Sequence, residues 1–443
     1  MRKFPLVLGL FCLAFSAPTY AVDDAAAVRA RIEMTLSEME RAVLKGDGAA
    51  YMANVRRDNA HFAKEQENWA ADLVKHTPSA FTLSIIAPPE GVTEEFGTDA
   101  ARFEMEMAWT MPGVGKDGAA VERSVSFPVL FIPDIAGERW LYAGEDWITI
   151  ETPPLDETAA DGRAGDARPA EPAPAPGQTP VHLRGRALCL AGYEDVAETI
   201  VGVMPEVRAH VDEGLGTRIQ RVQEVKVYPS VRHLQASIYL SYVDGLSGWN
   251  EPGEAIKVLG RPGASRKSMR SLLGHEYGHV ATAELGPKCS SMPWWVLEGV
   301  AELAAQDFAE SWAGRQRTMS RWAAAGTLAA WADLSDFRSV PLSLHGRVYA
   351  QGHHMLGFIS EQYGREKRNA WLTRMAQGDS VDAASRTALG VPFDELDRAW
   401  RASLRPDGAE PTPTPPAPPP PASPPPPPPS STPAEGAEAK PGP

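Results

Sequence analysis

The segment His275-Glu276-Tyr277-Gly278-His279, an H-E-x-x-H pattern, constrains this chain more than any other feature of its sequence. On a helix, residues at positions i and i+4 leave the same face one turn apart, so the two imidazoles can converge on one metal ion. Zinc accepts histidine nitrogens at about 2.0–2.1 Å. Glu276 would lie beside that ion without binding it, where it can take a proton from metal-bound water. The pattern predicts a helix that carries two metal ligands and a general base.

A third ligand follows on the next predicted helix, which Pro293 is expected to begin. Eighteen residues lie between His279 and Glu298. A chance H-E-x-x-H on a solvated helix needs no acid at that distance, so the downstream carboxylate favours a metal site over a chance match. His275, His279 and Glu298 are therefore predicted to bind Zn²⁺, with the fourth coordination position open to water, as in catalytic zinc sites.

Two further residues are assigned to this site. Glu302 lies one turn beyond Glu298, and it is predicted to accept a hydrogen bond from His275, which would fix the imidazole tautomer. The alternative makes Glu302 the third metal ligand. Tyr349 is predicted to stand at the head of a helix over 349–363 and to donate a hydrogen bond to the developing oxyanion. The alternative is a core tyrosine with a satisfied hydroxyl group.

The histidines near Tyr349 offer additional nitrogens. His345, His353 and His354 are interpreted as surface residues or as residues that contact the ligands, and not as further ligands. The predicted chemistry is hydrolysis of peptide bonds by a zinc-activated water, with Glu276 accepting the proton and passing it to the leaving amine. The chain is thus predicted to be an enzyme, a zinc metallopeptidase.

These residues resemble those of the gluzincin metallopeptidases, with the spacing of the aminopeptidase and leukotriene-hydrolase branch. In that branch, H-E-x-x-H is followed after eighteen residues by Glu-Gly, a tryptophan precedes the ligand segment, and a Tyr-x-x-Gly helix start carries the oxyanion tyrosine. The matching positions in this chain are His275, Glu276, His279, Trp294, Trp295, Glu298, Gly299, Tyr349 and Gly352. The resemblance implies a small sheet whose edge strand binds the substrate backbone, next to a mostly helical lobe that bears the zinc.

The chain departs from that branch in one segment. The branch carries Gly-x-Met-Glu-Asn, which holds the free amine of the substrate, whereas this chain reads GWNEPGE over 248–254. Glu251 or Glu254 could hold an amine, but neither lies in that pattern, so endopeptidase and exopeptidase activity both stay open. The metzincin pattern is absent, because Thr282 and Leu285 stand where it needs glycine and histidine.

The net charge limits the possible binding partners of this chain, and the N-terminal segment indicates its compartment. The formal net charge is −14, which disfavours nucleic acid and anionic membrane surfaces, since both select clustered cations. Residues 1–21 have the basic start, apolar run and small-residue end of a signal peptide. The alternative is an uncleaved anchor. No other stretch is long enough to span a bilayer, so we expect an exported protein, periplasmic or secreted, with peptide or protein substrates.

Proline and alanine content divides the chain. We expect an α+β accessory domain at 22–151, a Pro/Ala-rich linker at 152–180, the metallopeptidase domain at 181–404 and a disordered Pro-rich tail at 405–443. In the first domain, helices over 28–43 and 49–74 are predicted to precede strands at 81–86, 102–109, 124–132 and 140–150. Helices followed by an antiparallel sheet are an α+β plan. That order, with the run from Ala42 to Asp47, resembles the nuclear-transport-factor-2-like fold.

The second domain is predicted to combine a small sheet with many helices, which also makes it α+β. Strands are predicted at 181–190, 222–228 and 254–259, the last as an edge strand. Helices are predicted at 193–213, 231–240, 266–285 and 392–404, and 300–321 is expected to be mostly helical. A loop is expected over 333–344. Cys189 and Cys289 would either form a disulfide or stay as two buried thiols, and the sequence leaves both open.

Two other functions compete with the peptidase. One is a catalytically inactive gluzincin-like protein that serves as a binding or scaffold protein. The other is hydrolysis of a non-peptide ester or epoxide by the same zinc-activated water. The presence of all three ligands, the base and the tyrosine favours an active enzyme, because a degenerate scaffold usually loses one of them. The substrate, the oligomeric state and the role of the N-terminal domain stay open.

Overall fold

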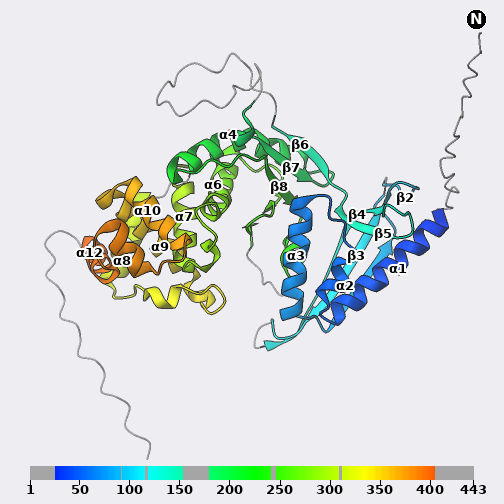
Figure 1. The fold of residues 1–443 in the computed structure, drawn as a ribbon, viewed down its shortest axis with the longest axis horizontal. Helices are drawn as coiled ribbons and strands as arrows, with labels where there is room; N and C mark the ends of the chain where they lie inside the picture. Colours follow the sequence, from blue (N-terminus) through cyan, green and yellow to red (C-terminus); the bar gives the residue numbers. More distant parts are fainter. Residues whose placement is uncertain are drawn as a thin grey trace, which may run out of the picture.

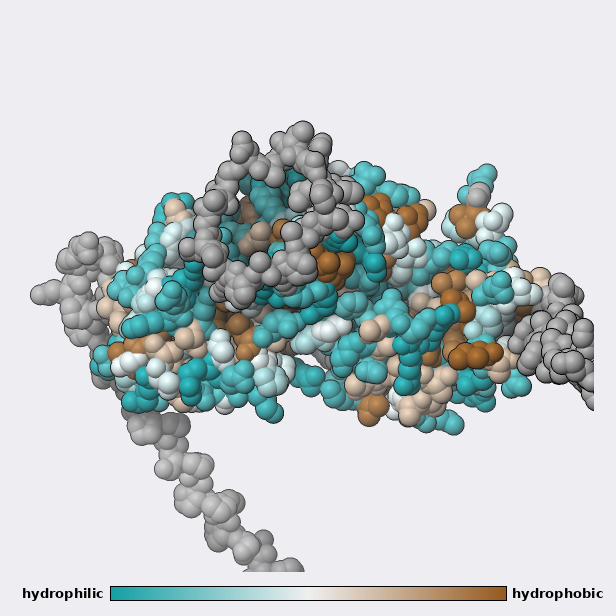
Figure 2. All heavy atoms as spheres, turned by 45° about the horizontal axis from the view of Figure 1, so that its top comes forward, coloured by the Kyte–Doolittle hydropathy of each residue, from teal (hydrophilic) through white to brown (hydrophobic). Residues whose placement is uncertain are grey.

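The computed structural model describes residues 25–90, 92–114, 118–152, 179–240, 246–308 and 312–404. The predicted signal peptide, nearly all of the predicted linker and the predicted tail lie outside these ranges. The fold is α+β, as predicted, with a helix-and-sheet unit followed by a second sheet and a mostly helical lobe (Figure 1). Among the described helices, none is both long and apolar enough to cross a bilayer. The face seen in Figure 2 is mainly hydrophilic, with small separate hydrophobic patches.

The N-terminal unit combines three helices with an antiparallel sheet. Its elements are α1 (Ala25–Leu44), α2 (Gly48–Met52), α3 (Ala60–Lys75), β1 (Ala80–Ile86), β2 (Glu95–Phe96), β3 (Ala101–Met111), β4 (Val121–Pro133) and β5 (Trp140–Glu145). The strand order is β1-β3-β4-β5, with β2 paired to β3. The apolar positions of α1, from Val28 to Val43, are buried, which confirms the amphipathic helix. The single helix predicted over 49–74 is wrong, because the chain turns after α2 and Val55 bridges to Tyr142 of β5.

The second sheet takes strands from both sides of the predicted linker. Its strands are β6 (Ile148–Glu151), β7 (Gly185–Cys189), β8 (Gln223–Tyr228), β9 (Gly248–Trp249) and β10 (Ile256–Leu259), in the order β6-β7-β8-β10-β9. The central strands β7, β8 and β10 are parallel, and helices α4 (Glu194–Leu215) and α5 (Val231–Ile238) lie in their connections. The strand predicted over 140–150 is therefore wrong, since it is divided between the two sheets. The strand predicted at 254–259 is internal and not at the edge, because β9 pairs with its outer side.

The C-terminal lobe is helical. Its helices are α6 (Arg266–Ala283), α7 (Trp294–Ala305), α8 (Trp312–Ala324), α9 (Leu342–Tyr363), α10 (Arg365–Ala376), α11 (Val381–Ala384) and α12 (Phe393–Ser403). Short turns of 3-10 or π helix occur at Val181–Leu183, Cys289–Ser291, Gln306–Phe308, Trp331–Leu334 and Ser385–Leu389. The described part of 300–321 is mostly helical, as predicted: α7 ends at Ala305, a 3-10 turn follows, and α8 begins at Trp312. Helix α9 begins at Leu342, inside the predicted loop, so Tyr349 lies about two turns within the helix and not at its head.

Three glycines allow the helices of this lobe to pack closely. A Cβ on Gly352 of α9 would lie 2.1 Å from the carbonyl oxygen of Trp295 on α7, and a Cβ on Gly299 would lie 2.6 Å from the backbone of Gly352. A Cβ on Gly278 of α6 would lie 3.0 Å from the Cα of Ala301 on α7. Larger residues would push these helices apart, so α6, α7 and α9 meet backbone to backbone.

The two cysteines of the described chain are separate thiols. Cys189, at the end of β7, and Cys289, after α6, are both buried and unpaired with each other. Burial raises the pKa of each thiol to about 11. Of the two possibilities that the sequence left open, the structure therefore shows two buried thiols, which behave as small core residues.

A buried ion pair joins the N-terminal unit to the second sheet, which α3 faces in Figure 1. Lys226 of β8 and Glu65 of α3 each have a side chain that is 3% exposed, and Lys226 Nζ lies 2.5 Å from Glu65 Oε2. The ammonium group also lies 5.6 and 5.7 Å from the ring centroids of Phe62 and Trp147. Burial opposes its charge, but the carboxylates of Glu65 and Glu145 outweigh burial and raise the pKa of Lys226 to about 12.

Replacing Lys226 by methionine is expected to destabilise the fold by about 3–5 kcal/mol, because the Glu65 carboxylate would stay buried without its cation. Chemical denaturation followed by circular dichroism measures the free energy of unfolding. The double variant Lys226→Met/Glu65→Leu removes both charges and is expected to recover most of the lost stability. An unfolding free energy unchanged by Lys226→Met would contradict the role given to this pair.

Candidate metal centre

The local sequence sets the helices that carry the predicted ligands. The side chain of Ser265 caps α6 by accepting a hydrogen bond from a backbone N–H of the first turn. Pro293 precedes the first residue of α7, where its missing N–H leaves no hydrogen bond unmade. His275 and His279 lie in the second half of α6, and Glu298 lies in the second turn of α7. Close packing of these two helices brings the three side chains to one place.

The three predicted ligands meet in the structure. One ligand atom from each of His275, His279 and Glu298 lies within 4.8 Å of the others. Glu298 Oε2 is 3.3 Å from His275 Nε2 and 3.6 Å from His279 Nε2. The other carboxylate oxygen accepts a hydrogen bond of 2.7 Å from Trp294 Nε1, which leaves Oε2 facing the imidazoles. Two imidazole nitrogens and a carboxylate oxygen are ligands that zinc takes in catalytic sites, so the residues present fit a zinc ion.

The electrostatics of the centre favour a cation. Burial opposes the charge of His275, but its contacts with Glu298 and Glu302 outweigh burial and raise its pKa to about 10. Burial would raise the pKa of Glu298, yet the charges of His279 and His275 hold that pKa well below its usual range. Burial also raises the pKa of Glu276, and the two histidines offset part of this increase. The centre therefore stabilises positive charge between its carboxylates, whether a proton or a metal ion carries it.

Glu302 connects the centre to α8. Its Oε1 lies 3.4 Å from His275 Nδ1, the nitrogen that faces away from Glu298, which is the contact that the sequence predicts. Its Oε2 accepts a hydrogen bond from Arg315 of α8. A carboxylate on Nδ1 leaves Nε2 as the nitrogen for a metal. The sequence analysis missed Arg315, because no helical spacing relates α8 to α7 and its positive charge was the only available signal.

Glu276 is buried beside strand β9. Glu276 is 6% exposed. A Cβ added to Gly248 of β9 would lie only 2.2 Å from Glu276 Oε1. A side chain at position 248 would therefore have to displace the Glu276 carboxylate. In the sequence, residues 248–254 indicate only a place for an amine-binding acid. They do not indicate this contact, because a single glycine in a short segment carries no signal of its neighbours.

The two acids considered for amine binding differ in their surroundings. Glu254 is 3% exposed, its Oε1 accepts a hydrogen bond of 2.6 Å from Asn68 of α3, and its Oε2 lies 3.0 Å from Lys257 Nζ. Glu254 is thus engaged inside the protein by one hydrogen bond and one ion pair, and it is not open to a substrate amine. Glu251 is partly exposed, and burial together with the charge of Glu254 raises its pKa. Of these two acids, Glu251 is the one left as a candidate.

Aromatic rings line one side of the centre. Tyr349 stacks on His275 with 6.0 Å between ring centroids, and Trp294 meets Tyr349 edge-on at 6.1 Å. Phe337 lies 5.0 Å from Trp294, and Trp249 of β9 lies 6.2 Å from Phe337. The rings of Tyr349, Phe337 and Trp249 are partly exposed. Together with Trp294, they form a chain of ring contacts from a predicted ligand to β9. Tyr349 reaches this place from within α9.

The histidines that follow Tyr349 on α9 are core residues. His353 is 1% exposed, and its Nε2 lies 2.9 Å from Gln306 Oε1. His354 is 7% exposed, and its Nδ1 accepts a hydrogen bond of 3.0 Å from Trp400 Nε1. Burial lowers the pKa of both to about 4, so both are neutral near pH 7. Of the two expectations for these histidines, surface residues or residues that contact the ligands, the first is wrong for His353 and His354, whereas His345 is partly exposed. None of the three joins the ligand cluster.

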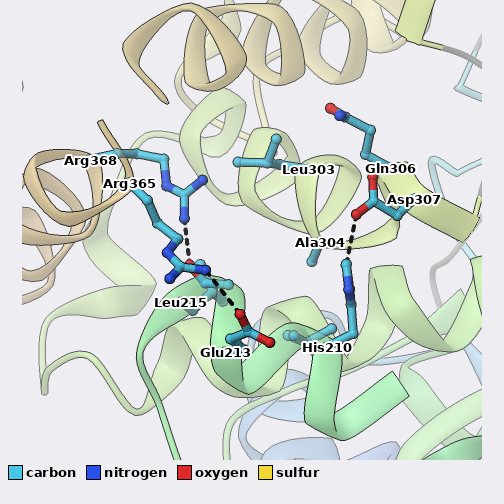
Figure 3. Close-up of a pocket in the computed structure, with 11 residues that line it drawn as sticks. His210, Glu213, Leu215, Leu303, Ala304, Gln306, Asp307, Arg365 and Arg368 are labelled. Atoms are coloured by element: carbon cyan, nitrogen blue, oxygen red, sulfur yellow. Dashed lines mark hydrogen bonds and ion pairs between the residues drawn. The ribbon is translucent and has the colours of Figure 1, made fainter. Parts of the chain in front are cut away.

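A separate polar cavity of about 320 Å³ lies between α4, α7 and α10 (Figure 3). Its charged side chains pair with one another, Arg365 with Glu213 at 3.5 Å and His210 with Asp307 at 3.7 Å. Arg368 donates a hydrogen bond to a backbone carbonyl at the end of α4. None of the predicted ligands lines this cavity, so it is distinct from the metal centre.

Residues 206–406 match the family model of the Peptidase MA superfamily. This span contains α6, α7 and α9, and hence every residue of the centre described above. The match supports a peptidase-type domain. Among curated proteins, no sequence matches this chain.

Solved structures similar to this chain include M1 zinc metallopeptidases from Deinococcus radiodurans. For a mutant form of that protein, the identity is 14% and the TM-score is 0.38, and the alignment covers 76% of this chain and 74% of the other. For another structure, the identity is 15% and the TM-score is 0.35, and the alignment covers 76% of this chain and 64% of the other.

The affinity for zinc is expected to rise by up to about tenfold per pH unit between about pH 6 and 9, because zinc binds neutral imidazole. In the metal-free protein, His275 keeps its proton up to a pKa of about 10, so metal binding must displace that proton, and the competition weakens as the pH rises. Competition with a chromophoric chelator at several pH values measures the affinity. An affinity that stops rising near the ordinary histidine pKa would contradict the contacts assigned to His275.

Proposed function

We propose that this chain is a zinc metallopeptidase that hydrolyses peptide bonds in peptides or proteins. The observation that carries the proposal is the convergence of His275, His279 and Glu298 next to the buried carboxylate of Glu276. The match of 206–406 to the Peptidase MA superfamily supports the same class of enzyme. A pair of histidines without a catalytic role would not need a buried acid beside it, whereas hydrolysis needs a general base next to the attacking water.

The proposed roles follow from position. When held by His275, His279 and Glu298, zinc would polarise the scissile carbonyl and lower the pKa of a water molecule to about 7. Glu276 accepts the proton of the attacking water and delivers it to the leaving amine. Because burial raises the pKa of Glu276, this side chain is suited to hold the proton between the two steps.

Two neighbouring residues complete the proposed mechanism. Tyr349 lies over His275 and is proposed to donate its hydroxyl hydrogen to the oxyanion that develops on the substrate carbonyl. Glu302, paired with Arg315, accepts the hydrogen of His275 Nδ1 and so keeps Nε2 as the ligand atom. Neither residue binds the metal in this assignment.

The substrate is proposed to bind along β9. In the described part of the chain, β9 pairs only with β10, so its other edge can accept an extended peptide by strand addition. The partly exposed rings of Trp249, Phe337 and Tyr349 would then receive apolar side chains of that peptide. Since Glu254 is engaged within the protein, an amine could be held only by Glu251 of the two acids, and endopeptidase and exopeptidase activity both stay open.

Export is proposed from the sequence alone. The signal peptide predicted at 1–21 supports a periplasmic or secreted protein, and the N-terminal sequence of the mature protein would test it. The division into an accessory domain at 22–151, a linker, a peptidase domain at 181–404 and a tail is likewise proposed. The nuclear-transport-factor-2-like resemblance of the first domain stays a prediction.

The variant Glu276→Gln is expected to lower kcat by about 10²–10⁴ while the protein keeps one zinc per chain, because the base is lost and the ligands are not. A peptide-library assay with and without a chelator measures cleavage, and elemental analysis measures zinc. Wild-type protein that holds zinc and cleaves no peptide would favour the binding or scaffold protein instead.

The variant Tyr349→Phe is expected to lower kcat by about 10²–10³ with little change in KM, since an oxyanion donor acts in the transition state. Steady-state kinetics on one peptide measures both constants. The ring stays in place in this variant, so stacking on His275 is preserved. A kcat equal to that of the wild type would assign Tyr349 to the core instead.

A further inference from the structure

We propose that α3 of the N-terminal unit positions β9 over Glu276, with Asn68 and His61 as the positioning residues. Helix α3 contacts the turn between β9 and β10, and β9 lies directly on the Glu276 carboxylate. The N-terminal unit thereby takes part in building the catalytic centre. Only the consequence for turnover rests on the proposed peptidase function.

One face of α3 holds the turn. His61 Nδ1 lies 3.0 Å from the carbonyl oxygen of Gly253, and Asn68 Nδ2 donates a hydrogen bond of 2.6 Å to Glu254 Oε1. Lys64 Cγ lies 3.3 Å from the position that a Cβ would take on Gly253, so the turn passes close beside the helix. His61, Lys64 and Asn68 are three and four residues apart, which places all three on the same face of α3.

Buried charge strengthens the Asn68 contact. Glu254 pairs with Lys257 at 3.0 Å, and Lys257 Nζ donates a hydrogen bond of 2.8 Å to the carbonyl oxygen of Ser237. A buried carboxylate is stable only when its oxygens have partners. Lys257 forms an ion pair with Oε2, and Asn68 donates the hydrogen bond to Oε1. Loss of the Asn68 amide therefore leaves Oε1 without its donor. The turn is then expected to open toward water.

The turn controls β9 because this strand is only two residues long. Gly248 and Trp249 pair with β10, and Leu259 N donates a hydrogen bond of 2.9 Å to the carbonyl oxygen of Ser247 just before the strand. The Glu276 carboxylate fills the space where Gly248 would carry a side chain. Since strand and carboxylate touch, movement of β9 displaces both the general base and the edge proposed to bind substrate.

Hydrogen exchange of the amides in 246–259, measured on the full chain by mass spectrometry, tests the proposal without catalysis. Asn68→Ala and His61→Ala are each expected to raise exchange in this segment about tenfold and to leave α6 unchanged. Asn68→Asp keeps the shape of the side chain but sets a second acceptor against Glu254. It is expected to raise exchange at least as much as Asn68→Ala, whereas a packing role alone would tolerate it.

Gln66→Ala is the matched control. Gln66 lies on the same helix and is partly exposed, but it accepts a hydrogen bond of 2.6 Å from Tyr51 within the N-terminal unit. Exchange in 246–259 is expected to match the wild type in this variant. A thermal scan shows whether Asn68→Asp is folded. If it is unfolded, His61→Ala tests the proposal instead, again by raised exchange in 246–259 with unchanged exchange in α6.

Turnover supplies the functional measurement. In Asn68→Asp, kcat for a fluorogenic peptide is expected to fall about tenfold while zinc content is unchanged, because the base moves and the ligands do not. Unchanged exchange in 246–259 overturns the proposal, as does raised exchange with an unchanged kcat. Wild-type protein without any turnover overturns the proposed peptidase function, and the exchange measurement then decides the positioning role by itself.

Discussion

The close approach of α7 to α6 and α9 is the constraint on which the metal centre depends. At Gly299 and Gly352 the two backbones leave no space for a Cβ, and at Gly278 between α6 and α7 a Cβ would lie in tight contact, 3.0 Å from the Cα of Ala301. This packing sets Glu298 3.3 Å from one imidazole and 3.6 Å from the other. Three side chains from two helices can share one ion only if the helices are that close, so the glycines serve the chemistry through packing.

Compensation of buried charge is the second constraint, and it recurs in two places. In the centre, Glu298 and Glu302 bracket His275 and direct its two nitrogens. Between the N-terminal unit and the second sheet, Glu65 pairs with Lys226, and Asn68 of α3 donates a hydrogen bond to Glu254, which itself pairs with Lys257 within the second sheet. Burying such groups costs free energy unless each has its partner, so these pairs fix orientation more than they add stability. Through them, the N-terminal unit is tied to the strand beside Glu276.

The sequence predicts best where the signal is local. The helix of His275 and His279, the following helix of Glu298 and the amphipathic α1 all occur where the spacing of residues indicates. The errors occur where distant contacts decide. The strand pattern over 140–150 looks continuous, yet the chain changes sheets within it. His353 and His354 have polar side chains that are usually exposed, but both lie in the core, where Gln306 and Trp400 each contact one ring nitrogen.

By itself, the sequence determined which three side chains are predicted to bind a metal, the α+β class and the acidic charge, because spacing along a helix and composition are properties of the chain alone. Only the tertiary structure decided three contacts. Arg315 donates a hydrogen bond to Glu302, Gly248 packs against the Glu276 carboxylate, and Asn68 donates a hydrogen bond to Glu254. These contacts join segments far apart in the sequence, and their distances depend on how helices and strands pack, which no local pattern records.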